Sequence, residues 1–143
     1  MNGTTNDIGD PVTVRDAVEA DLDALAALSG TRAMHADRMR EAMRWLATKF
    51  EPQAFLNQPE SDRSDSPGML IAFFEQAGIM IQKRFVNEDV VLDHLARHVV
   101  ANWNKLKPLI EHERRQLNDD RVGEHFEYLY RRAVAYEAKQ SKK

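Results

Sequence analysis

One segment of the sequence carries apolar side chains on nearly every side of a helix. A helix that is apolar all round is buried on all sides, in the interior of a protein or in a membrane. The polar pair Glu75 and Gln76 interrupts the run, which is shorter than the roughly 18–20 apolar residues that a membrane span needs. Residues 69–84 therefore predict the central helix of a bundle, which other helices must cover. The apolar positions are Leu70, Ile71, Phe73, Phe74, Ala77, Ile79, Met80 and Ile81.

Four further stretches, residues 14–28, 36–50, 88–117 and 122–139, space their apolar residues by three and four, as helices do. Ser66-Pro67 and Asn87 are typical starts for the central helix and for the long one that follows it. Pro108 lies inside the long stretch and predicts either a kink or a break there. The only strand candidate, residues 12–14, is too short to stand alone. We therefore expect an all-α, single-domain bundle of five to six helices.

The domain organisation follows from length and charge. A chain of 143 residues is long enough for one well-packed domain but not for two. The first 30 residues hold six acidic residues and one arginine, so that segment is acidic. We expect a flexible tail at 1–11, an acidic N-terminal segment at 12–30, a helical domain at 31–139 and a basic tail at 140–143. Within the domain, residues 57–68 hold two prolines and no apolar residue, which predicts a linker.

Composition excludes several classes of function. The chain has no cysteine, which removes thiolate chemistry, disulfides and Cys-based metal sites. Its net charge of −3 argues against a protein that neutralises nucleic-acid phosphates. The sequence shows no membrane-spanning segment, no signal peptide and no glycine-rich phosphate-binding motif, so we expect a cytoplasmic protein with no cofactor.

Two sets of polar residues suggest chemistry. Glu75 and Gln76 lie in the apolar helix, where a carboxylate must be paired, hydrogen-bonded or protonated. His94 and His98, four residues apart on a helix, project from one face and are a candidate metal pair. A metal site also needs a third ligand, for which the nearby candidates are Asp93, His112 and Glu113. The alternatives are a buried ion pair or an exposed edge for Glu75, and a surface pair for the histidines.

The C-terminal helix combines arginines and lysines with aromatic residues, a composition that can bind single-stranded nucleic acid. From Lys105 to the last residue, seven acidic residues lie among ten basic ones, which favours a solvated face of mixed charge. From this region Trp103 and Arg114 join Glu75 and Gln76 as candidates to line a pocket between helices.

Two stretches resemble known families. Residues 13–28 resemble the opening strand and helix of the acetyl-CoA-dependent N-acetyltransferases, but that family's glycine-rich pyrophosphate loop has no counterpart here, so no activity is carried over. Residues 39–137 resemble a bacterial family of small helical proteins of unknown function, many with an N-terminal membrane anchor. We expect the acidic segment at 12–30 to take the place of that anchor in this chain. The resemblance implies a helical fold and assigns no catalytic residue. Its motifs lie at 39–46, 73–78, 87–91, 103–110, 113–115 and 126–129.

These observations favour a protein-interaction or scaffold module that self-associates. A second copy would cover the excess of apolar helical surface. An enzyme or ligand-binding protein with a pocket around Glu75 or around His94 and His98 is the first alternative. Single-stranded nucleic-acid binding by the C-terminal helix is the second.

Overall fold

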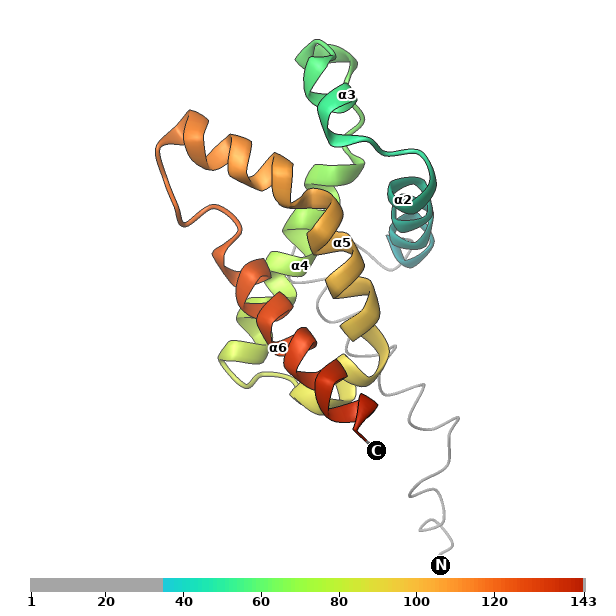
Figure 1. The fold of residues 1–143 in the computed structure, drawn as a ribbon, viewed down its shortest axis with the longest axis vertical. Helices are drawn as coiled ribbons and strands as arrows, with labels where there is room; N and C mark the ends of the chain where they lie inside the picture. Colours follow the sequence, from blue (N-terminus) through green and yellow to red (C-terminus); the bar gives the residue numbers. More distant parts are fainter. Residues whose placement is uncertain (1–34, 143) are drawn as a thin grey trace, which may run out of the picture.

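The computed structural model describes residues 35–142, and all of its regular elements there are helical. The elements are α2 (His35–Thr48), α3 (Pro52–Asn57), the 3-10 turn η2 (Glu60–Asp62), α4 (Ser66–Gln82), α5 (Glu88–Leu117) and α6 (Glu124–Ser141). Figure 1 shows α4, α5 and α6 side by side, with α2 beside them and α3 at the opposite end from the C-terminus. The expected all-α, single-domain bundle is confirmed. The strand candidate at 12–14 and the helix expected at 14–28 lie outside the described residues.

Helix α4 is the centre of this bundle, as its apolar sequence predicts. It packs against α6 and also contacts α2 and α5. Its largest side chains are buried, and the ring of Phe74 stacks on that of Phe126 in α6 with centroids 4.8 Å apart. The buried residues of α4 are Pro67, Leu70, Phe73, Phe74, Ala77, Gly78, Met80 and Ile81.

Helix α5 runs unbroken through Pro108, so of the two expectations the kink holds and the break does not. The proline removes the N–H that would bond to Asn104, and Figure 1 shows the helix changing direction as its colour passes from gold to orange. Asn87 caps its first turn by accepting a bond from the Val90 N–H at 3.1 Å. Leu117 is the last apolar residue of the stretch 88–117 that predicted this helix. It is 61% exposed in the last turn, beyond the buried residues of the helix.

The predicted linker holds more local structure than its composition suggests. The linker contains η2 and follows the short helix α3. The sequence did not predict a helix at the position of α3. Glu51 caps α3 by accepting from the Ala54 N–H at 2.8 Å, and Pro52 fits the first turn because that position needs no N–H. Arg63 then fastens the linker: its Nη2 donates to the Leu56 carbonyl at 2.8 Å, and its guanidinium lies over the Phe55 ring.

Candidate functional site

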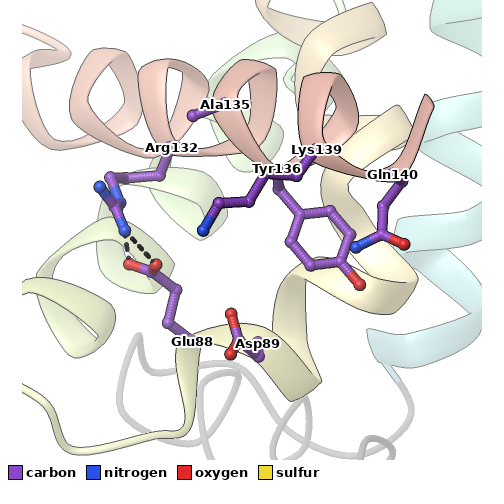
Figure 2. A pocket seen from close by; sticks show the side chains of 7 residues that line it. All are labelled: Glu88, Asp89, Arg132, Ala135, Tyr136, Lys139 and Gln140. Atoms are coloured by element: carbon purple, nitrogen blue, oxygen red, sulfur yellow. Dashed lines mark hydrogen bonds and ion pairs between the residues drawn. The ribbon is translucent and has the colours of Figure 1, made fainter. Parts of the chain in front are cut away.

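A surface hollow of about 470 Å³ lies between the first turn of α5 and the last turns of α6. Figure 2 shows α5 forming one wall and α6 the other. The lining residues are Glu88, Asp89, Arg132, Ala135, Tyr136, Lys139 and Gln140.

The two walls carry opposite charges. Glu88 and Asp89 occupy the first turn of α5, where carboxylates are favoured by the positive end of the helix dipole. Arg132 and Lys139 extend from α6. Arg132 ties the walls together, because its Nε donates to Glu88 Oε1 at 3.0 Å and its Nη2 to the other carboxylate oxygen (Figure 2). Asp89 and Lys139 take part in none of the ion pairs between described residues.

A second bond across the hollow joins Tyr136 to α5. Its hydroxyl donates to Asp93 Oδ1 at 2.6 Å. This bond to a carboxylate, followed by burial and by the negative charges of Asp93 and Asp89, raises the pKa of Tyr136 to about 12. The ring thus remains a neutral phenol over the physiological range and presents a flat aromatic surface to the hollow.

The turn between α4 and α5 carries an exposed aromatic side chain. Phe85 is 68% exposed, the highest exposure among the large apolar residues of the described chain. Its position is set by a Schellman ending of α4, in which the Phe85 N–H bonds to the Met80 carbonyl and the Arg84 N–H to that of Ile81. Arg84 occupies the left-handed region, with φ of 62°, where glycine is usual. A residue other than glycine there costs some free energy, and Asn118 ends α5 in the same left-handed conformation.

Glu75, nominated from its place in an apolar helix, serves as a helix cap. Helix α6 begins after Gly123, which has no side chain with which to cap it. Glu75 Oε1 instead accepts a bond from the Phe126 N–H at 2.7 Å, so α4 caps the third residue of α6. Gln76, its neighbour, is half-buried on α4.

Gly78 explains how α4 and α6 come so close. A Cβ built at Gly78 would lie 2.1 Å from the carbonyl oxygen of His125, so only glycine fits there. Gly78 is therefore a point of close approach between α4 and α6. The Nδ1 atom of His125 also lies 3.2 Å from the side-chain Oε1 atom of Gln82 in α4. The motif at 73–78 thus forms the surface of α4 against which the first turn of α6 packs.

The two other pocket candidates also have roles in holding the fold. Trp103 is 4% exposed and stacks on Tyr130 at 5.5 Å between ring centroids. Arg114 secures the turn between α5 and α6: its Nε donates to the Val122 carbonyl at 2.7 Å, and its Nη2 donates to Glu127 at 2.9 Å. The bond from Arg114 is the main reason that the pKa of Glu127 is lowered. Glu75, Trp103 and Arg114 therefore all contact the start of α6 or the turn that precedes it.

His94 and His98 are both exposed on α5, on the same helix as the hollow. No group of three histidine or carboxylate residues within residues 35–142 has a geometry that could hold a metal ion. The backbone carbonyl of His98 accepts from Asn102 Nδ2 at 2.6 Å. Arg131 and Arg132, considered for nucleic-acid binding, are paired with Glu127 and Glu88.

The residues of the hollow were missed because they come together only in the folded chain. Arg132 and Tyr136 meet Glu88 and Asp93 across 44 and 43 residues of sequence. One local signal was available: Phe85 lies in the short turn between Gln82, where α4 ends, and Asn87, which caps α5. A large apolar residue in a turn so short is a candidate for exposure.

The chain belongs to the family described as a domain of unknown function, DUF4760, whose model matches residues 17–133. Comparison with curated proteins finds no match, and comparison with solved structures finds none either. The match includes the whole junction of Glu75, Gly78 and Phe126, and it ends in α6 before Tyr136 and Lys139. Among residues 35–142 no helix is both long and apolar enough to cross a membrane.

Proposed function

We propose that this protein is a cytoplasmic interaction module that self-associates, and that it uses the end of the molecule formed by the α4–α5 turn and the hollow. The observation that carries the proposal is Phe85, which is 68% exposed within three residues of Glu88 in the hollow. Large aromatic residues and arginine dominate the binding energy of protein interfaces. Phe85, Tyr136 and Arg132 bring those residue types to one end of the molecule.

The candidate residues from the sequence support an interaction module over an enzyme. Glu75 Oε1 holds the first turn of α6, and Arg114 holds the preceding turn. Both therefore have a structural use that accounts for a polar group at these positions.

Sedimentation velocity of the full chain over a hundredfold range of concentration tests the proposal. We expect the weight-average mass to rise from that of the 16.4 kDa chain toward twice that value. A mass that stays at one chain across the whole range would contradict self-association.

A further inference from the structure

We infer that two copies of this chain meet at the α4–α5 turn, with Phe85 of one copy against Phe85 of the other on a two-fold axis. The inference rests on the proposed function and identifies its surface. In a two-fold interface the same patch meets itself, so the patch must complement its own rotated copy. The turn meets this requirement through the order of its side chains, which runs from basic through aromatic to acidic.

The aromatic side chain stands at the centre of this patch. Phe85 is 68% exposed and lies between Gln82, the last residue of α4, and Asn87, the N-cap of α5. Its N–H bonds to the Met80 carbonyl, which fixes its backbone at the end of α4. When the patch meets its own copy, the two rings contact each other and leave water together. Buried aromatic residues of this kind supply much of the binding energy of protein interfaces.

Charged side chains flank the ring, and their sign differs between the two helices. Lys83 and Arg84 follow the last residue of α4 and are exposed, whereas Asp89 is exposed in the first turn of α5. These three residues take part in none of the ion pairs between described residues. Glu88, by contrast, is bonded to Arg132 within the same chain. Asp89 is therefore the acid that a second copy can reach.

One rotation satisfies the aromatic and the charged contacts together. An axis at Phe85 lays the two turns side by side in opposite directions, so the α4 side of one copy faces the α5 side of the other. Arg84 then meets Asp89 of the second copy, and symmetry forms this pair twice. A partner of uniform charge would meet attraction on one side of the ring and repulsion on the other, which favours a second copy as the occupant.

The size of the patch determines how strongly two copies hold together. Residues 83–89 are fewer than the about 20–30 residues that each side of a standard interface contributes. We therefore expect a reversible dimer whose population rises with concentration. Figure 1 shows the turn at the end of the molecule opposite α3, so two copies approach each other end to end.

Variants of the full chain test the patch, each checked for helical content by circular dichroism. Phe85→Ser, Arg84→Asp and Asp89→Arg are each expected to raise the dimer dissociation constant at least tenfold. Leu117→Ser is the matched control for the ring, because Leu117 is a comparably exposed apolar residue at the far end of α5. Glu111→Arg is the control for charge, because Glu111 is exposed on α5 far from the turn. Both controls are expected to leave the dissociation constant unchanged.

The double variant Arg84→Asp with Asp89→Arg tests the pairing itself. It exchanges the two charges, so each copy again sets an acid opposite a base, and we expect a dissociation constant within threefold of the wild-type value. Mixing the two single variants restores both pairs in the mixed dimer. Native mass spectrometry is therefore expected to show that dimer in excess over either variant's own dimer.

The outcomes separate this surface from self-association in general. If the wild-type chain dimerises but Phe85→Ser dimerises equally well, the α4–α5 turn is not the surface and self-association stands. The same conclusion follows if the double variant dimerises no better than the single ones, or if the mixed dimer has no advantage. A wild-type chain that stays monomeric overturns both proposals.

Discussion

At the residue scale, Tyr136 shows how one hydrogen bond determines a side chain's chemistry. Donation to the Asp93 carboxylate favours the neutral phenol in the folded state and raises its pKa from 10.0 to about 12. A group whose pKa is raised on folding adds stability that is complete below its unfolded pKa and is lost as the pH rises through its folded pKa. The contribution of Tyr136 is therefore intact below pH 10 and lost between about pH 10 and 12.

Near-ultraviolet titration of phenolate absorbance checks this value. Subtracting the Tyr136→Phe curve from the wild-type curve isolates Tyr136 among the three tyrosines. We expect a midpoint near 12 in the wild-type chain and one closer to 10 in Asp93→Ala. A wild-type midpoint at 10 would show that the bond does not form.

Glu75 is the residue whose role the sequence suggested and the structure explains. Because its carboxylate caps α6, Glu75→Ala is expected to lower the free energy of unfolding by about 1–2 kcal/mol. Glu75→Gln keeps an oxygen that accepts the same bond and is expected to lose less than half as much. Urea unfolding measures both, and equal losses in the two variants would contradict the capping role.

At the scale of helices, the close approach of α4 and α6 depends on Gly78. A methyl group there meets the His125 carbonyl, so Gly78→Ala is expected to push the helices apart and cost about 3 kcal/mol. Gly68→Ala, in the first turn of the same helix, is the matched control because nothing lies within 4 Å of its added Cβ. We expect it to be neutral or stabilising by up to about 1 kcal/mol. Similar losses in both variants would contradict a contact specific to Gly78.

The elements that sequence reasoning located have local causes. Ser66-Pro67 starts α4, Asn87 caps α5, and most of the apolar residues of α4 are buried, with Ile71 and Ile79 half-buried. Those that it missed depend on contacts between distant residues. Glu75 reaches Phe126 across 51 residues, so a local reading sees only a carboxylate in an apolar helix. The hollow likewise needs α5 and α6 to be packed before its two walls exist.

At the scale of the whole molecule, the two ends of the bundle differ. The end near α3 is fastened by Arg63. The opposite end carries Phe85 and the hollow with its two charged walls. Two-fold association through this second end would bury the most exposed large apolar side chain of the described residues, and it would leave α3 on the outside of the dimer (Figure 1).

Electron-spin distance measurement tests this arrangement most directly, because a chain without cysteine accepts a nitroxide at a single introduced cysteine. Ser141→Cys places the label at the end of α6, and Ala54→Cys places it on α3 at the opposite end. In the dimer we expect a distance between copies from Ser141 that is clearly shorter than the one from Ala54. A shorter distance from Ala54, or no dipolar coupling from either label, would contradict association through the end that carries Phe85.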